Sequence, residues 1–190
     1  MELTKEFLSD IFSQALSYDD YLASASAQQS QRWSDVHQAA KVTDKQEQLL
    51  SGFTREMNVL AVSSTACGDC IEQMPLVAKI SQVSEKINLR FIDRDANAQL
   101  RDTLKINAGN RVPVLVFMAE DFEFCSAYGD RSLTRYRSIA DRMLGAACST
   151  GLFIPEDDEL AGTLSDWLNE FERIQLMLRL SARLRQKHND

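Results

Sequence analysis

Two cysteines at the start of an apolar helical pattern constrain this chain more than any other feature. The stretch 59–83 opens with an apolar, β-branched run, breaks at 63–65, and continues from Cys67 with apolar residues at helical spacing. This order predicts a strand, a tight turn and a helix, with Cys67 and Cys70 at the junction between turn and helix.

The spacing of these cysteines allows a disulfide between them to form and break in place. Residues three apart on a helix share a face, so the two sulfur atoms can reach the short separation that a disulfide requires. Unpaired backbone N–H groups and the helix dipole favour a thiolate at Cys67. Cys70 lies one turn further along and should be better shielded. We therefore predict that Cys67 attacks a disulfide and that Cys70 resolves the mixed disulfide.

Charge and hydropathy limit the partners. The 190 residues carry a formal net charge of −7, which argues against nucleic acid because phosphate binding needs a basic surface. No stretch approaches the roughly 20 apolar residues of a membrane span, and the acidic N-terminus lacks the order of a secretory signal. We expect a cytoplasmic protein with no membrane partner, in which the four cysteines do not form a disulfide framework.

Helical patterns precede the cysteine motif. Apolar residues across 2–22 recur at helical spacing and predict one helix, and a further helical segment is expected at 33–40. Thr43 and Gln46 have the spacing of a capping box before 48–53. Because such helices are too short to persist alone, we expect 1–57 to be a helical extension packed on the core.

Strands and helices alternate after the motif. The predicted elements are a strand at 89–93, a helix at 96–106 that ends by Gly109, strands at 112–118 and 122–127 joined as a hairpin, and a helix at 132–144. The first two strands and the helix between them form a β-α-β unit, so these strands should be parallel with a right-handed crossover.

The C-terminal part of the chain predicts one more helix. A break at 149–155 and an acidic run at 156–159 precede a helical pattern over about 164–186, whose apolar stripe is wider than a solvated helix needs. We expect 146–190 to be a helical extension packed on the domain. A homodimer contact through the terminal helices is the alternative.

The order of elements and three motifs resemble the thioredoxin superfamily. Pro75 lies five positions after Cys70, as in the active-site helix of that family. Val112 and Pro113 open the third strand, where the family has a cis-proline that faces the cysteine pair. A CxxC motif after a strand, together with both prolines, is a far more specific signal than a CxxC motif alone.

The resemblance covers about 59–144 and implies the fold of a domain at 58–145. That fold is α/β, with a central mixed β-sheet flanked by helices, and the extensions add N-terminal and C-terminal helices. Tyr128 and Gly129 fall where the family has a hydrophobic residue and a glycine beside the active site. With Val112 and Pro113, they are the predicted substrate-binding residues.

The sequence also departs from the family pattern. Ala66 stands where the family has a tryptophan before the first cysteine, and Asp69 stands where it has a proline between the pair. A buried aspartate expected near Ala61 and its lysine partner expected near Leu89 are both missing. Proton handling at the second cysteine must then use water or another group.

The position of Asp69 indicates whether the cysteine pair is reducing or oxidising. An acid in the first helical turn stabilises the helix but repels the Cys67 thiolate, and about 1.4 kcal/mol of repulsion would raise the thiol pKa by about one unit. A destabilised thiolate makes the dithiol a better reductant, so we predict a reducing centre. Arg111 would act in the opposite direction if its guanidinium reached the sulfur. Ala66, Gly68, Asp69 and Arg111 are therefore the residues expected to tune the active site.

The predicted function is thiol–disulfide exchange. The resemblance implies a thioredoxin-like enzyme that reduces a disulfide of a protein or of a low-molecular-weight thiol through Cys67 and Cys70. No cofactor is expected, but a reductase or a thiol pool must regenerate the dithiol. The backbone of Val112 beside Pro113 would pair with an extended substrate segment.

Two other classes of function remain open. One is a binding or adaptor protein of the same fold, or a redox sensor, that has no general reductase turnover. The other is a metal-binding module, which we disfavour because the remaining candidate ligands have no zinc-like spacing; these are Cys125, Cys148, His37 and His188. We expect Cys125 and Cys148 to be buried thiols and expect no metal site.

Overall fold

A four-stranded mixed sheet forms the centre of the molecule. The computed structural model describes residues 3–144 and 159–190. The strands are β1 (Met57–Ser63), β2 (Ile87–Asp93), β3 (Val114–Ala119) and β4 (Phe124–Gly129), in the order β2-β1-β3-β4. β1 pairs with β2 in parallel, and β3 is antiparallel to both β1 and β4. The predicted α/β fold with a central mixed sheet is confirmed, as are the parallel β-α-β unit and the hairpin.

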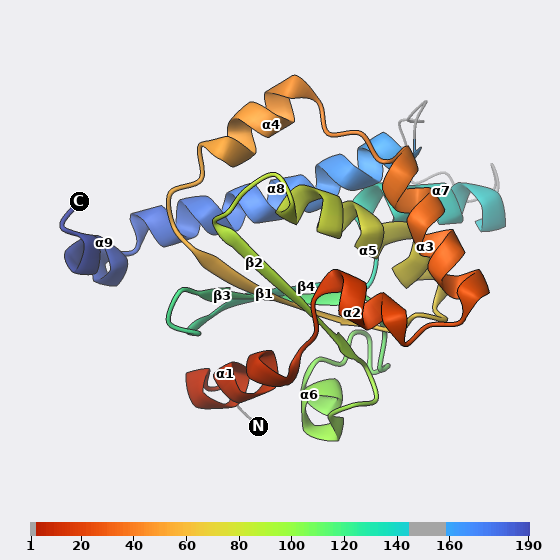
Figure 1. Cartoon of the computed structure of the whole chain (residues 1–190), viewed down its shortest axis with the longest axis horizontal. Helices are drawn as coiled ribbons and strands as arrows, with labels where there is room; N and C mark the ends of the chain where they lie inside the picture. The colour runs from red at the N-terminus through yellow and green to blue at the C-terminus, as the bar shows by residue number, and fades with distance from the viewer. Residues whose placement is uncertain (1–2, 145–158) are drawn as a thin grey trace.

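Helices cover both faces of this sheet (Figure 1). α5 (Gly68–Ser81) joins β1 to β2, α6 (Ala98–Thr103) lies between β2 and β3, and α7 (Leu133–Leu144) follows β4. The terminal segments add α1 (Lys5–Gln14), α2 (Tyr18–Ala23), α3 (Ala27–Ala39), α4 (Asp44–Ser51), α8 (Glu159–Leu180) and α9 (Ala182–His188). In Figure 1, α5 and α8 lie on one side of the sheet, and α1 and α6 lie on the other.

The prediction of one helix over 2–22 is wrong, because the chain is interrupted between α1 and α2. Leu16 exchanges two backbone hydrogen bonds of 2.8 Å with Phe91 in β2. The Ser17 side chain then caps α2 by accepting a hydrogen bond from the Asp20 N–H. The apolar spacing runs through this break, so periodicity alone could not reveal it.

The remaining N-terminal helices begin at capping boxes. Ser26 and Gln29 cap α3, which therefore starts earlier than the predicted segment 33–40. Thr43 and Gln46 cap α4 in the predicted way. The connection between α4 and the sheet is short, and β1 begins at Met57.

The C-terminal helix is also divided. α8 begins at Glu159, earlier than predicted, and α9 begins after Ser181, whose side chain accepts a hydrogen bond from the Leu184 N–H. The resulting turn buries Leu184. The predicted break at 149–155 and Cys148 lie outside the described residues. Within 3–144 and 159–190, no helix has the length and apolar character needed to cross a bilayer.

Aromatic contacts fix both terminal helical segments to the sheet. The Tyr21 ring of α2 stacks on Phe91 of β2 with centroids 5.4 Å apart. The Trp33 ring of α3 meets the same phenylalanine edge-on at 6.5 Å. On the same face of the sheet, Phe171 of α8 packs edge-on against Phe117 of β3 at 5.2 Å. Together these contacts bury a large apolar area, which is the main favourable contribution to folding.

Candidate active site

The turn between β1 and α5 holds Cys67 at the mouth of the helix. Cys67 is the N-cap residue of α5, and its side chain makes no capping hydrogen bond. Its backbone N–H donates to the Ser64 carbonyl oxygen at 3.1 Å. The buried Trp33 indole donates to the carbonyl oxygen of Thr65 at 3.1 Å. The turn is therefore held by α3 as well as by its own backbone. The Cys67 sulfur does not cap the helix.

The two thiols differ in exposure. Cys67 is partly exposed and Cys70 is fully buried, and neither forms a disulfide in this structure. The Cys67 sulfur lies 3.8 Å from the Val112 carbonyl oxygen. The peptide bond between Val112 and Pro113 is cis. Val112 and Pro113, which resemble the family's cis-proline segment, therefore lie directly against Cys67.

The thiols also differ in acidity. The Cys70 thiol, together with backbone N–H groups of Cys70 and Asp69, lowers the pKa of Cys67 to about 6, against the opposing effects of burial and of the Asp69 charge. Burial, followed by the interaction with Cys67, raises the pKa of Cys70 strongly. At neutral pH Cys67 is therefore mostly a thiolate and Cys70 a thiol, the distribution expected of an attacking and a resolving cysteine.

The Asp69 charge acts to raise the pKa of Cys67, as expected, but its effect is smaller than that of Cys70, and the pKa is still lowered to about 6. The Asp69 carboxylate pairs with Arg131, at 2.9 and 2.7 Å, and with Arg135 at 3.4 Å. Because opposite charges at hydrogen-bond distance attract strongly, these arginines compensate part of the Asp69 charge. Both arginines follow β4, far from Asp69 in sequence.

Arg111 does not make the contact with the sulfur that we considered. Its guanidinium lies 3.1 Å from the carboxylate of Asp130, which is 3% exposed. The Tyr136 hydroxyl donates a hydrogen bond to the same carboxylate. Arg111 therefore binds the loop after β4.

Gln73 is a buried polar residue of α5 that the sequence did not single out. Its side-chain oxygen accepts hydrogen bonds from the Ser132 backbone N–H at 2.9 Å and the Trp167 indole at 3.2 Å. Its side-chain nitrogen donates to the carbonyl oxygens of Asp69 and Asp130, each at 3.2 Å. This amide joins the active-site helix, the loop after β4 and α8. A lone glutamine in a helical pattern carries no signal of such a network.

The other predicted residues lie around this centre. Ala66 and Gly68 are exposed on either side of Cys67. Gly129 packs so closely on the Pro113 carbonyl oxygen that a Cβ would overlap it. The Tyr128 ring packs edge-on against Trp167, with centroids 5.1 Å apart. Tyr128 thus contributes to packing against α8, and its contact with substrate stays a prediction.

Cys125 is only partly buried, in contrast to the expected buried thiol. It lies in β4, and burial raises its pKa. Over the described parts of the chain, no group of three or more His, Cys, Asp or Glu side chains is arranged to hold a metal ion.

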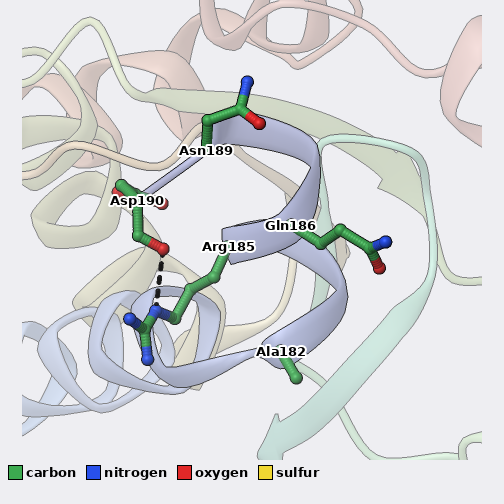
Figure 2. A pocket seen from close by; sticks show the side chains of 5 residues that line it. All are labelled: Ala182, Arg185, Gln186, Asn189 and Asp190. Atoms are coloured by element: carbon green, nitrogen blue, oxygen red, sulfur yellow. Dashed lines mark hydrogen bonds between the residues drawn. The ribbon is translucent and has the colours of Figure 1, made fainter.

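A hollow of about 430 Å³ lies at the C-terminal end of the chain. It is lined by Ala182, Arg185, Gln186, Asn189 and Asp190, and Figure 2 shows the Arg185 guanidinium donating to the Asp190 carbonyl oxygen at 2.9 Å. α9 and the start of α5 lie at opposite ends of the molecule (Figure 1). This hollow is therefore separate from the cysteine site.

Comparisons with known proteins agree with this fold. A thioredoxin family model matches residues 15–142, a range that begins before β1 and includes α2, α3 and α4. The chain is similar in structure to a protein of unknown function from Pseudomonas aeruginosa, with a TM-score of 0.69, 16% identity, and coverage of 87% of this chain and 97% of that one. It is also similar to an HIV epitope-scaffold, with a TM-score of 0.66, 15% identity and the same coverage of 87% and 97%. These likenesses describe the fold alone. No curated protein matches the chain.

Proposed function

This chain belongs to the thioredoxin family, and we propose that it is a thiol–disulfide oxidoreductase acting through Cys67 and Cys70. One observation carries the proposal: a partly exposed cysteine whose pKa is lowered to about 6 lies beside a buried cysteine whose pKa is raised. A structural pair of thiols needs no such difference, whereas an attacking and a resolving thiol do.

The proposed cycle transfers two electrons from the protein to its substrate. The Cys67 thiolate attacks one sulfur of the substrate disulfide, and the other substrate sulfur leaves as a thiolate that takes up a proton. Cys70 then loses its proton and attacks the Cys67 sulfur. The bond between Cys67 and Cys70 forms as the second substrate thiolate leaves. An external dithiol or a thiol pool returns the pair to its reduced state, and no cofactor takes part.

We propose that the physiological direction is reduction. This proposal rests on the acidity of Cys67 and not on Asp69, whose carboxylate is paired with Arg131. The Cys67 pKa of about 6 lies nearer to that of thioredoxin, about 7, than to that of the strong oxidant DsbA, about 3.5. The corresponding potentials are about −270 and −120 mV. A compartment with a reduced thiol pool, the cytoplasm, suits such a centre.

The proposed substrate is a disulfide in an extended protein segment or in a low-molecular-weight thiol. Val112 and Pro113 border Cys67, and the Val112 carbonyl oxygen lies 3.8 Å from its sulfur. A backbone carbonyl at this position can accept a hydrogen bond from an extended chain, which orients the substrate sulfur toward Cys67. Gly129 packs directly on the Pro113 carbonyl oxygen.

The test is a redox titration of the full chain in glutathione and dithiothreitol buffers, together with an assay of protein-disulfide reduction. Cys67→Ser and Cys70→Ser remove the two thiols, and Cys125→Ser is the matched control at a cysteine outside the site. We expect wild type and Cys125→Ser to show a reversible two-electron transition and turnover. Cys67→Ser should lose both, and Cys70→Ser should accumulate a mixed disulfide at Cys67.

Two results would contradict the proposal. A reversible transition without turnover on any disulfide would favour a redox sensor or adaptor over an enzyme. Turnover in Cys67→Ser equal to that of Cys125→Ser would show that the activity does not come from exchange at the CxxC pair.

A further inference from the structure

Two buried hydroxyl groups, those of Ser63 and Tyr21, lie near Cys70. Ser63, the last residue of β1, is fully buried, and Tyr21 of α2 is 2% exposed. Neither hydroxyl forms a regular hydrogen bond with any described residue. Buried polar groups in proteins are almost always paired, so two neighbouring exceptions at this place require a reason.

The position of these hydroxyls points to the sulfur of Cys70. The Ser63 hydroxyl faces both the Cys70 thiol and the Tyr21 hydroxyl. The Tyr21 ring is held between Phe91, at 5.4 Å, and Trp33, at 5.9 Å. Ser63, Tyr21 and Cys70 therefore form a buried row that runs from the N-terminal helices to the resolving cysteine. Ala61, on the same strand, contributes no polar group to it.

We propose that Ser63 donates a hydrogen bond to Cys70 when that thiol becomes a thiolate, and that Tyr21 is a positioning residue that supports Ser63. The inference rests on the proposed function, because only the resolving step produces a thiolate at this buried site. In the resting protein Cys70 is a thiol, a weak hydrogen-bond acceptor, so the hydroxyls lack a strong partner until the reaction reaches that step.

The chemistry of the three groups fits this role. A serine and a tyrosine hydroxyl can each rotate to donate, and the interaction with Ser63 acts to lower the pKa of Cys70 against the effect of burial. Burial raises the pKa of Tyr21, so this residue stays a neutral donor and is not a base. The charged and titratable groups near the row are Cys67, Asp93 and Arg94.

The protons and electrons of the step balance without the hydroxyls changing state. The Cys70 proton passes to water or to the departing substrate thiolate. The Cys70 thiolate supplies the electron pair for its bond to the Cys67 sulfur, and the bond between Cys67 and the substrate breaks. Ser63 and Tyr21 keep their own protons and stabilise the negative charge while it exists, as preorganised donors do in other buried sites.

Ellman's disulfide reagent separates the two steps in a single turnover of the reduced protein. The first coloured thiolate reports attack by Cys67, and the second reports resolution by Cys70. For Ser63→Ala and Tyr21→Phe we expect the first release to stay within about twofold of wild type. The second should be slower by about tenfold, with its rise moved to higher pH, since tenfold corresponds to about one pKa unit in the thiol.

Tyr18→Phe is the matched control. Tyr18 belongs to the same aromatic cluster, with its ring 5.5 Å from Phe91, and its hydroxyl is likewise buried without a regular partner. Burial and Asp19 raise its pKa, with no contribution from a cysteine. Its second release should equal that of wild type. Ser63→Thr keeps the hydroxyl and should restore the pH dependence that Ser63→Ala loses.

The outcomes distinguish this inference from the proposed function. Failure of wild type to release either thiolate would overturn the proposed exchange itself. Two normal releases in wild type, with a second release that is unchanged in both Ser63→Ala and Tyr21→Phe, would overturn the role of the hydroxyls alone. An equal slowing in Tyr18→Phe would also overturn it, because the effect would then belong to packing.

Discussion

Arg131 holds the Asp69 carboxylate through two parallel hydrogen bonds, with Nε 2.9 Å from Oδ1 and Nη2 2.7 Å from Oδ2. This bidentate geometry is the strongest form of arginine–carboxylate pairing. Asp69 lies between the two cysteines, and Arg131 lies in the loop after β4. The pair therefore fixes that loop to the start of α5 and at the same time compensates a negative charge beside the Cys67 thiolate.

Opposite changes in the acidity of Cys67 should follow from Arg131→Gln and Asp69→Asn. Arg131→Gln leaves more of the Asp69 charge uncompensated, so the pKa of Cys67 should rise from about 6. Asp69→Asn removes that charge, so the pKa of Cys67 should fall. At a pH below 6 we expect alkylation of Cys67 by iodoacetamide to change about two- to tenfold, or about 0.4–1.4 kcal/mol. A change in the same direction in both variants would indicate loosening of the helix and contradict the electrostatic explanation.

The pH dependence of alkylation should also report the hydrogen bond from Cys70. This thiol is the largest cause of the lowered pKa of Cys67, which is about 6. In wild type the rate should rise through pH 6 and level off above about pH 7, because the thiolate is the nucleophile. In Cys70→Ala the midpoint should move to higher pH, since the thiolate loses its donor. Cys125→Ala, the same change outside the site, should keep the wild-type midpoint; a common midpoint in all three proteins would refute this explanation.

The cysteine motif and the β-α-β unit could be predicted because their signals are local. The spacing of Cys67 and Cys70, the apolar strand before them and the helical period after them all lie in one short stretch. The same logic failed at Leu16, where an apolar residue at helical spacing makes strand-like hydrogen bonds with Phe91. Pairing with a distant strand overrides a local pattern there.

The electrostatics of the site could not be predicted in this way. The pairing of Asp69 with Arg131 has no local signal, because Arg131 follows β4 and lies far from Asp69 in the sequence. Gln73 likewise acquires its partners from the loop after β4 and from α8. Residues whose role depends on several distant segments have no signature in the spacing of a single stretch.

Loss of the Gln73 amide should destabilise the fold. Gln73→Leu would leave the Trp167 indole, the Ser132 N–H and the Asp130 carbonyl oxygen without this partner inside the protein. Each unpaired buried group costs about 1–3 kcal/mol, so for three groups we expect a total loss of at least about 3 kcal/mol. Urea unfolding of the reduced protein measures it. Gln82→Leu, the same change at an exposed position that ends α5, should cost less than about 0.5 kcal/mol. Similar losses in the two variants would show that the buried network contributes little.

The packing of Gly129 on the proline segment gives the last prediction. A Cβ at Gly129 would overlap the Pro113 carbonyl oxygen and lie 3.1 Å from the Val114 Cα, and both are backbone atoms that cannot rotate away. Gly129→Ala must therefore displace the start of β3 and the segment before it that carries Val112, whose carbonyl oxygen lies 3.8 Å from the Cys67 sulfur. We expect a loss of about 1–3 kcal/mol in stability and slower reduction of a protein disulfide.

Gly68→Ala is the matched control for stability. A Cβ there meets no atom within 4 Å, and Gly68 is the first helical residue of α5. Alanine restricts the unfolded chain, so Gly68→Ala should leave stability unchanged or raise it by up to about 1 kcal/mol. If Gly129→Ala unfolds at the same urea concentration as Gly68→Ala, the backbone near Pro113 yields easily, and the close contact cannot be what positions Val112 against the attacking sulfur.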